Sequence, residues 1–345
     1  MNIVILHSEV PPHASQDEQD VLEQVHVVSQ ALCALGYSPV AVPLSLDLPA
    51  VVHTVQRLHP VCVFNLVETV TGQGYGIHLG PLVLEMLHLP YTGVDMTAMF
   101  ATSNKLIAKQ CLVAAGLPTP PWCSVAEIQR GSVPFTGPYI VKSVWEHGSI
   151  GLDDDAVVVT PAQIWPVLAQ RCQTYGGLWF VERYIAGREF NLSLLAGDAG
   201  PELLPPAEME FMAYPSEKVK IVGYAAKWHA TSFEHQHTCR RFAFPLEDAA
   251  LLARLEELVH RCWQHFALRG YARIDFRVDE AGVPWVLEVN ANPCLAPDSG
   301  FLAAAQQAGY TTVQVVQRIL ADVADTPLRA LPWDGTVGAV RTSGG

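Results

Sequence analysis

Oxygen-bearing side chains suited to a hard metal ion fall in two neighbouring apolar segments of the chain. The segments, residues 271–278 and 283–289, flank an Asp-Glu-Ala-Gly turn sequence, which predicts a β-hairpin. Asp275 would then lie opposite Glu288, and Asn290, two residues after Glu288, would share its face of the sheet. Two carboxylates and one amide oxygen suit Mg²⁺, which also takes phosphate oxygens and water. The hairpin therefore predicts a magnesium site.

Arg273 belongs to the same predicted site, because it lies two residues before Asp275 and points to the same face. The alternative interpretation is a hairpin with a solvated acidic edge. That alternative is disfavoured because the apolar run 285–287 comes directly before Glu288.

Candidate nucleotide-binding side chains follow apolar segments earlier in the chain. Phosphate transfer at magnesium needs cations on the phosphates, a cover over them and an apolar slot for the base. Lys142 ends the apolar segment before a glycine-bearing loop (145–151), and Lys105 lies in a predicted helix. Residues 182–185 (Glu-Arg-Tyr-Ile) suit the edge of an adenine pocket, and Glu189 could accept ribose hydroxyls. A single Lys or Glu is usually solvated surface, so the order of these residues carries the interpretation.

The composition is that of a compact globular protein. The chain has 345 residues, 50% hydrophobic and 16% charged, which is enough for two or three lobes. Its 21 basic and 34 acidic residues give a net charge of −13, which argues against nucleic acid or an anionic membrane as the main partner. No apolar stretch reaches about 18 residues and the start lacks signal-peptide features, so a cytoplasmic location is expected. The eight cysteines contain no C-x-x-C pair and are expected to be reduced thiols.

The order of predicted elements divides the chain into four parts. Residues 1–95 alternate apolar strands with amphipathic helices, as in a parallel α/β domain. Residues 96–199 begin with a helix expected over 96–115 and form a central α+β lobe that holds the glycine-bearing loop. Residues 200–326 form a second α+β lobe that contains the hairpin. Residues 327–345 lose periodicity and are expected to be a loose tail.

These motifs, in this order, resemble the ATP-grasp carboxylate–amine ligases, and most closely the D-alanine–D-alanine ligase family. The matching segments are residues 89–93, 104–105, 115–122, 140–142, 148–151, 181–190, 226–228, 273–275, 287–290 and 298–300. So many ordered matches along nearly the whole chain make the resemblance specific. It implies the ATP-grasp fold, with an N-terminal parallel α/β domain followed by two ATP-grasp lobes.

The resemblance also implies a reaction in which ATP activates a carboxylate as an acyl phosphate, which an amine then attacks to give an amide, ADP and phosphate. The residues implied to hold ATP are Lys105, Lys142, Glu182, Arg183, Tyr184, Ile185, Glu189 and Lys227. Those implied to bind a pair of Mg²⁺ ions, for which Mn²⁺ could substitute, are Asp275, Glu288 and Asn290. Those implied in catalysis are Arg273, Lys227 and Ser149. A homodimer is implied as well.

Several substrate-reading positions depart from the family pattern. The family has a glycine-rich N-terminal loop with a glutamate, whereas residues 7–13 read His-Ser-Glu-Val-Pro-Pro-His. Gly148 stands in place of a lid-loop serine, and Trp228 follows Lys227 in place of a tyrosine. Glu68 stands where the family usually has a histidine and could bind a substrate ammonium. The alternative for Glu68 is a helix-capping or simply exposed carboxylate.

The substrates implied are therefore an amino-acid or peptide-like acid and an amine that are not both D-alanine. The residues predicted to contact them are Glu68, Gly148, Trp228, Asp298 and Ser299. The alternatives are a true D-alanine–D-alanine ligase, a kinase or carboxylate–thiol ligase of the same superfamily, and a non-catalytic ATP-binding regulator. The intact residues Arg273, Asp275, Glu288 and Asn290 argue against the regulator.

Histidine and cysteine cluster between residues 229 and 239, which raises the alternative of a zinc site. Their spacing matches no common structural zinc site. We expect a partly exposed loop over the active site instead.

Overall fold

The N-terminal domain is a parallel sheet covered by helices. The structure is a computed structural model that describes residues 1–131 and 133–324. The strands are β1 (Asn2–Ser8), β2 (Ser38–Leu44) and β3 (Cys62–Leu66), all parallel, in the order β2-β1-β3. The other elements are α1 (Gln16–Ala34), α2 (Leu48–Leu58), the short turn η1 (Gly74–Gly76) and α3 (Leu79–Met86). The alternation of strands and helices predicted this arrangement.

Helix α1 begins at a capping box, lines the cavity near its start and packs in the core further along. The Glu18 carboxylate accepts the backbone N–H of Ser15 at 2.9 Å, which satisfies a donor at the helix start. Val28 and Leu32 are buried in the core of the domain, whereas Asp20 lines the cavity described below. Because these positions are multiples of four residues apart, one stripe of the helix carries the site residue near its start and the core residues further on.

The helix expected over residues 96–115 is two helices, so the single-helix prediction is wrong. The two are α4 (Met96–Ser103) and α5 (Lys105–Ala114). Between them Asn104 has an extended backbone, and its side-chain oxygen accepts the N–H groups of Leu106 and Ile107 at 3.0 Å each. Asn104 caps α5 because its short polar side chain competes with helix continuation. Lys105 is therefore the first residue of a helix.

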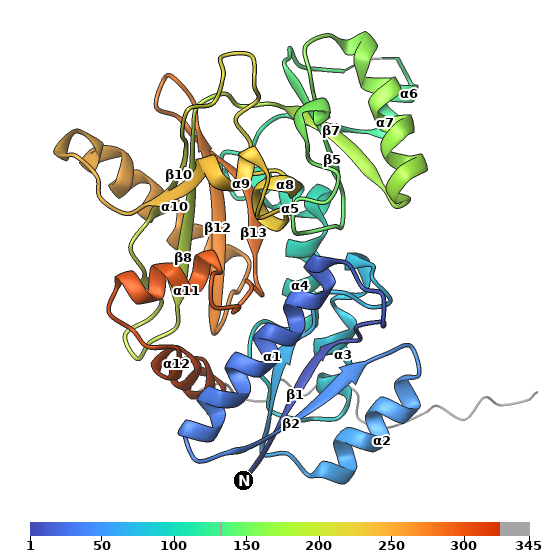
Figure 1. The fold of residues 1–345 in the computed structure, drawn as a ribbon, viewed down its shortest axis with the longest axis vertical. Coiled ribbons are helices and arrows are strands. Elements are labelled where there is room, and N and C mark those ends of the chain that lie inside the picture. Colours follow the sequence, from blue (N-terminus) through green and yellow to red (C-terminus); the bar gives the residue numbers. More distant parts are fainter. Residues whose placement is uncertain (132, 325–345) are drawn as a thin grey trace, which may run out of the picture.

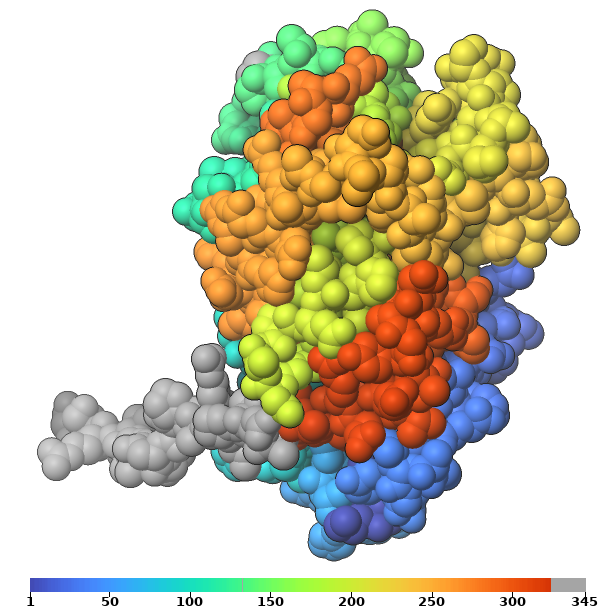
Figure 2. All heavy atoms as spheres, turned by 90° about the vertical axis from the view of Figure 1, so that its left-hand side faces the viewer, coloured from blue at the N-terminus to red at the C-terminus, as the bar shows by residue number. Residues whose placement is uncertain are grey.

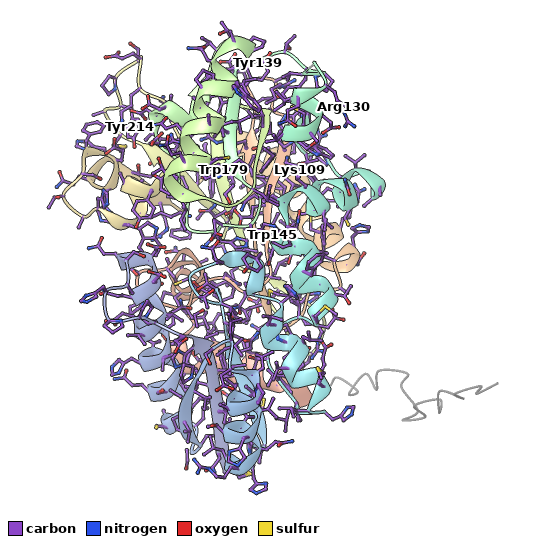
Figure 3. All side chains as sticks on the ribbon, turned by 90° about the vertical axis from the view of Figure 1, so that its right-hand side faces the viewer. Lys109, Arg130, Tyr139, Trp145, Trp179 and Tyr214 are labelled. Atoms are coloured by element: carbon purple, nitrogen blue, oxygen red, sulfur yellow. The ribbon has the colours of Figure 1, made fainter. Side chains whose placement is uncertain are left out.

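A small antiparallel lobe follows, at the top of Figure 1. Its strands are β4 (Trp122–Ser124), β5 (Tyr139–Ser143), β6 (Val157–Val158) and β7 (Trp179–Arg183), in the order β4-β7-β5-β6. Its helical elements are α6 (Val125–Gln129), η2 (Asp154–Ala156) and α7 (Pro161–Tyr175). Figure 3 shows Tyr139 and Trp179, both core residues, inside this lobe, and Trp145 where the lobe meets the N-terminal domain.

The larger lobe is built on an antiparallel sheet that carries the hairpin. Its strands are β8 (Arg188–Leu195), β9 (Glu202–Leu203), β10 (Ala207–Phe211), β11 (Thr238–Arg241), β12 (Tyr271–Val278) and β13 (Pro284–Asn290). Five of them follow the order β11-β10-β8-β12-β13, and β9 pairs with β8. Its helical elements are α8 (Tyr224–Trp228), α9 (Phe233–His237), η3 (Leu246–Asp248), α10 (Ala249–His265), α11 (Gly300–Gln307) and α12 (Thr312–Ala324). Because β8 belongs to this sheet, the lobe begins before the boundary that we placed at residue 199.

The N-terminal domain shares one core with helices α11 and α12. Ile5 and Phe64 of the N-terminal sheet pack in the same buried cluster as Phe301 and Val315 of α11 and α12. Figure 2 shows the red C-terminal helices against the blue N-terminal domain. This packing holds the N-terminal domain against the larger lobe, and Asp20 of α1 contacts Cys294, in the segment that follows the hairpin.

The observed architecture confirms the predicted mixture of α/β and α+β folds. The residues described contain no helix long and apolar enough to cross a membrane. The tail predicted over residues 327–345 lies outside the described residues.

Candidate active site

A cavity of about 1220 Å³ lies between the N-terminal domain, the small lobe and the larger lobe, and most of the predicted site residues line it. Those that line it are Glu68, Lys142, Gly148, Ser149, Glu182, Arg183, Tyr184, Ile185, Glu189, Lys227, Trp228, Arg273, Asp275, Glu288, Asn290, Asp298 and Ser299. Lys105 does not line it. Residues separated by more than two hundred positions in the sequence thus line one cavity.

The hairpin forms as predicted, with Asp275 paired opposite Glu288 and Arg273 opposite Asn290. The register shifts between Asp275 and Phe276, at a β-bulge. A bulge locally increases the twist of a strand pair and is common beside active sites. The four polar residues therefore lie together on adjacent strands.

Arg273 and Asp275 form a two-pronged ion pair. Arg273 Nε lies 2.8 Å from Asp275 Oδ1, and Nη2 lies 3.0 Å from Oδ2. Asn191 Nδ2 also donates to Asp275 Oδ1 at 2.9 Å. Burial alone would lower the pKa of Arg273, but the Asp275 carboxylate outweighs burial and raises it. The guanidinium is thus held charged in a fixed orientation.

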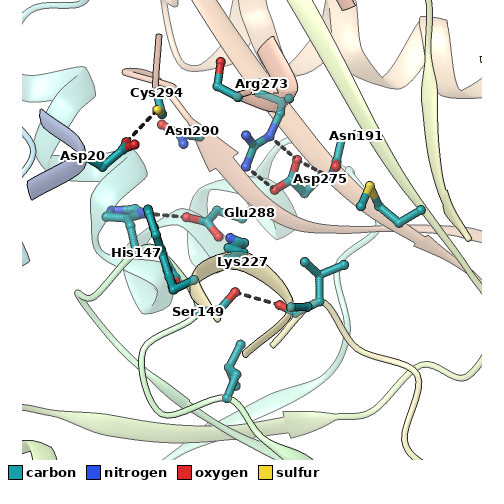
Figure 4. Close-up of a pocket in the computed structure, with 18 of the residues that line it drawn as sticks. Asp20, His147, Ser149, Asn191, Lys227, Arg273, Asp275, Glu288, Asn290 and Cys294 are labelled. Atoms are coloured by element: carbon teal, nitrogen blue, oxygen red, sulfur yellow. Dashed lines mark hydrogen bonds and ion pairs between the residues drawn. The ribbon is translucent and has the colours of Figure 1, made fainter. Parts of the chain in front are cut away.

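Glu288 is surrounded by basic side chains. Burial would raise its pKa, but Lys105, His147 and Lys227 outweigh burial and hold the pKa well below its ordinary value. Figure 4 shows Lys227 and His147 on either side of this carboxylate. Enclosure in the cavity, and then the charge of Arg273, lower the pKa of Lys227. The site therefore concentrates positive charge around an ionised carboxylate.

A second carboxylate, Glu182, holds two lysines at the small lobe. Its oxygens lie 2.6 Å from Lys142 Nζ and 2.6 Å from Lys109 Nζ, and its side chain is 1% exposed. Burial would raise the pKa of Glu182, but the two ammonium groups together leave it lowered. Figure 3 shows Lys109 on α5, next to this lobe. The side chain of Glu182 therefore positions Lys142 at the cavity wall.

The glycine-bearing loop, residues 145–151, contacts both the hairpin and helix α8. His147 Nδ1 bonds to Glu288 Oε1. Trp228 Nε1 donates to Gly148 O at 2.9 Å, and Ser149 Oγ donates to Val222 O at 2.7 Å. Gly148 and Ser149 have positive φ angles of 68° and 64°, which suits the glycine and strains the serine. We call this segment the lid loop.

The apolar slot expected for a base lies at the end of β7. Ile140 and Ile185 are buried residues that line the cavity there, beside Tyr184. Glu189, on the next strand, lies 2.8 Å from Arg277, which the sequence reasoning had not singled out. An apolar slot bordered by a carboxylate suits a nucleoside, whose flat base is apolar on its faces and whose ribose carries hydroxyls.

Lys105 lies behind the lid loop. It is 8% exposed, and its Nζ donates to the backbone oxygen of Glu146 at 2.7 Å. Glu288 is among the charges that act on it. Lys105 therefore holds the backbone of the lid loop through this hydrogen bond.

The part of the cavity lined by α1 and by the segment after β3 is acidic, and we call it the acidic end. Gln24 Nε2 donates to Glu68 Oε1 at 2.8 Å and lies 3.3 Å from Asp20 Oδ2. Cys294 Sγ donates to Asp20 Oδ2 at 3.0 Å. Burial raises the pKa of Glu68 to about 7 and also raises that of Asp20. Neither carboxylate has a cation in contact among residues 1–131 and 133–324, so both would gain from a cationic ligand.

Asp298 and Ser299 lie at the start of α11. Ser299 is its N-cap, and its hydroxyl accepts the N–H of Leu302 at 3.3 Å. The backbone oxygen of Asp298 accepts from Arg240 Nη1 at 3.0 Å. The sequence reasoning missed Arg240, because only the sheet pairing brings β11 beside this helix.

Other site residues were also missed. Lys109 lies one helical turn after Lys105, so it could have been found as a second lysine on the same face. Asp20 and His147 carried no comparable signal, because Asp20 resembles any charged residue of an amphipathic helix and His147 any polar loop residue.

Comparisons with known proteins agree with this geometry. Residues 112–321 match the family model described as "D-ala D-ala ligase C-terminus". A D-alanine–D-alanine ligase of Synechococcus sp. is 31% identical over 328 residues, which cover 93% of each chain. The chain belongs to the D-alanine–D-alanine ligase family. Members are ATP-grasp ligases that form a C–N bond between a carboxylate and an amine, and this chain is one of them.

Two further similarities refine this placement. The uncharacterized protein y4sG of Sinorhizobium fredii is 32% identical over 263 residues, covering 76% of this chain and 74% of the relative. A D-alanine–D-alanine ligase of Bacillus anthracis, solved in complex with ATP, has a TM-score of 0.70 at 20% identity and covers 94% of this chain and 97% of its own. The structural likeness confirms the ATP-grasp fold predicted from the sequence.

Proposed function

We propose that this ligase joins an amino-acid or peptide-like acid to an amine through an acyl phosphate, and that its substrates are not both D-alanine. The distribution of charge carries the proposal. Lys142, Lys227 and Arg273 line the cavity, and so do Asp20 and Glu68, which Gln24 joins. Cations attract a triphosphate and a carboxylate, whereas the two carboxylates suit an ammonium.

The hairpin oxygens fit Mg²⁺. Glu288 is ionised, and Asp275 and Asn290 add hard oxygen donors on the same two strands. The described residues contain no group of three or more His, Cys, Asp or Glu side chains placed to hold a metal. The chain would thus supply two carboxylates and an amide, with phosphate oxygens and water completing the coordination. Bound there, Mg²⁺ or Mn²⁺ would neutralise phosphate charge.

The side chains have separate roles in the proposed reaction. Lys142 and Lys227 bind phosphate oxygens and reduce the repulsion between the triphosphate and the attacking carboxylate. Arg273, oriented by Asp275, donates to the oxygen that becomes negative when the amine attacks the acyl phosphate. The lid loop keeps water from the acyl phosphate, which would otherwise hydrolyse.

Two groups at the acidic end would hold an amino substrate. Burial disfavours the ionised forms of Asp20 and Glu68, and an ammonium between them would stabilise those ionised forms. Glu68 is anchored for this by Gln24, and its backbone N–H donates to Ser8 Oγ at 2.9 Å. This structure supports the ammonium role over that of a helix cap.

D-alanine–D-alanine synthesis is the second candidate, favoured by the names of several relatives. The substitutions Gly148 and Trp228 disfavour it, because Trp228 uses its indole N–H on the lid loop where a tyrosine would present a hydroxyl. A homodimer and a cytoplasmic location remain predictions, and light scattering would test the first.

The deciding experiment measures ADP release from ATP and Mg²⁺ with pools of amino acids and related acids, D-alanine included, and examines the products by mass spectrometry. An amide other than D-alanyl-D-alanine is expected. A phosphorylated acid or a thioester as the only product would replace the proposal with a kinase or a carboxylate–thiol ligase. D-Alanyl-D-alanine as the main product would refute the substrate argument alone.

A further inference from the structure

Lys109, on α5, is a buried lysine that the reaction described so far does not use. Its side chain is 2% exposed, and it does not line the cavity. Its Nζ lies 2.6 Å from Glu182 Oε2, 2.9 Å from Thr119 Oγ1 and 3.2 Å from the backbone oxygen of Pro120. An ammonium has three N–H donors, so these three acceptors leave none for a ligand. Lys109 therefore acts only through its protein partners.

The hydrogen bonds of Lys109 require an ammonium. Thr119 Oγ1 donates its own proton to the backbone oxygen of Val286 at 2.9 Å, so it must accept from Lys109. The backbone oxygen can only accept, and Glu182 is ionised because the two lysines hold its pKa low. A neutral amine has two N–H groups, which is one too few. Burial lowers the pKa of Lys109, but Glu182 opposes burial, and the ring of Trp122, centred 5.5 Å from Nζ, adds a cation–π contact.

Lys142 reaches the same carboxylate from the cavity. Ile140 of β5 pairs with Glu182 of β7, and Lys142, two residues after Ile140, points to the same face of the sheet. Lys142 Nζ lies 2.6 Å from Glu182 Oε1, so each carboxylate oxygen takes one lysine. Within residues 1–131 and 133–324 no second acceptor is found for Lys142. Two of its N–H groups are therefore left for a ligand in the cavity that it lines.

The charges of this trio determine what a ligand meets at Lys142. One carboxylate and two ammonium groups leave a single net positive charge. Lys109 is enclosed and has no donor left, so that charge is presented to the cavity at Lys142. Without Lys109, Glu182 and Lys142 would form a neutral pair. Such a pair attracts an anion far less than a net cation does, above all where water is excluded.

We propose that Lys109 is a positioning residue that balances the charge of Glu182, so that Lys142 keeps its positive charge for the phosphates of ATP. Lys109 touches neither substrate nor reacting atoms. This inference rests on the proposed role of Lys142 in phosphate binding. It makes the affinity for the triphosphate depend on a lysine outside the cavity.

A double-mutant cycle tests this dependence. Equilibrium binding of a non-hydrolysable ATP analogue with Mg²⁺ is measured for the wild type, Lys109→Gln, Glu182→Gln and the double variant. We expect Lys109→Gln alone to raise Kd for the analogue about ten-fold or more, because Glu182 then neutralises Lys142. In the Glu182→Gln background the same change should have little effect, because no carboxylate remains to neutralise Lys142. Adenosine, which carries no phosphate, should bind equally well with and without Lys109.

Two further variants separate charge from packing. Lys109→Arg keeps the charge and should keep most of the affinity for the analogue. Arg171→Gln removes another buried cation of the small lobe, one that is bonded to Asp153 and is 3% exposed. It should leave Kd unchanged, because its carboxylate partner does not contact Lys142. Circular dichroism checks each fold, and if Lys109→Gln does not fold, Lys109→Met, which buries no polar group, takes its place in the cycle.

An equal rise of Kd in both backgrounds would overturn the inference, because Lys109 would then only stabilise the fold. An affinity as low in Lys109→Arg as in Lys109→Gln would overturn it too. Neither result affects the ligase proposal, which amide formation by the wild type decides. A wild type that binds the analogue but forms no amide would instead refute the ligase proposal, and the cycle would still decide the role of Lys109.

Discussion

His147 of the lid loop bonds through Nδ1 to the carboxylate of Glu288 on β13, so the lid loop is joined directly to the hairpin. The other ring nitrogen of His147, Nε2, is buried and has no hydrogen-bond partner among the described residues. The contact fixes the orientation of a carboxylate that we assign to metal binding, and such supporting contacts commonly affect metal affinity. Because the lid loop carries His147, lid closure and metal binding should be linked.

Replacing His147 with alanine should therefore weaken Mg²⁺ binding. We expect the Mg²⁺ concentration needed for half-maximal activity to rise by about 10–100-fold. Hydrogen exchange should also become faster in residues 145–151. His53→Ala, on the exposed side of α2, serves as the control. Unchanged lid exchange together with unchanged Mg²⁺ binding would contradict the link.

Replacing Glu288 with glutamine should abolish turnover while the fold stays intact. The amide keeps the shape of the side chain but removes the charge that would bind the metal. Turnover and circular dichroism would be measured side by side. Glu280→Gln, in the exposed turn of the same hairpin, should remain active. A fully active Glu288→Gln enzyme would rule out the metal assignment.

Replacing Glu182 with glutamine should destabilise the small lobe. The change leaves the buried ammonium of Lys109 and that of Lys142 without their carboxylate. Removing one partner of a buried ion pair costs about 3–5 kcal/mol, which urea denaturation would measure. Glu127→Gln, at an exposed carboxylate on α6, should cost far less. An equal loss of unfolding free energy in both variants would show that the buried ion pairs stabilise the lobe no more than the exposed carboxylate does.

The acidic end predicts a dependence on pH. Burial raises the pKa of Glu68 from 4.5 to about 7, and nearby Asp20 and Asp17 add to the effect. A carboxyl whose folded pKa is raised favours folding while it is protonated, so its contribution is lost as pH rises towards about 7. Glu68→Gln should therefore be more stable than the wild type by roughly 1–3 kcal/mol at about pH 8, but not at about pH 5.

The same group should act in the opposite direction on substrate binding. An ammonium binds the ionised form of Glu68, so KM for the amino substrate should rise in the wild type as pH falls below about 7. Glu68→Gln should have a high KM that hardly depends on pH in this range. A wild-type KM that is flat across the range would remove Glu68 from the ammonium site.

The double substitution Gly148→Ser and Trp228→Tyr should not by itself create D-alanyl-D-alanine synthesis. Gly148 has a φ of 68°, which strains a serine, and the acidic end of the cavity is unchanged by the double substitution. Mass spectrometry of the products would reveal the dipeptide. Its detection would contradict our view of substrate choice.

The sequence by itself determined the local elements and the residue pairing within the hairpin. Alternating apolar residues and a turn sequence fix which strands pair, so Asp275 opposite Glu288 follows from local rules. The parallel N-terminal sheet likewise follows from its strand–helix alternation. The break at Asn104 was missed because a polar side chain can cap a helix or simply face solvent, and only its contacts decide between the two.

Only the tertiary structure decided the substrate end of the cavity. Asp20, Arg240 and Cys294 come from a helix, an edge strand and a connecting segment that are far apart in the sequence. Each has an ordinary local context, so no spacing rule joins them. Their charges matter because packing of α11 and α12 on the N-terminal domain encloses them in one cavity. Enclosure removes water and strengthens each interaction, and it is a property of the whole fold.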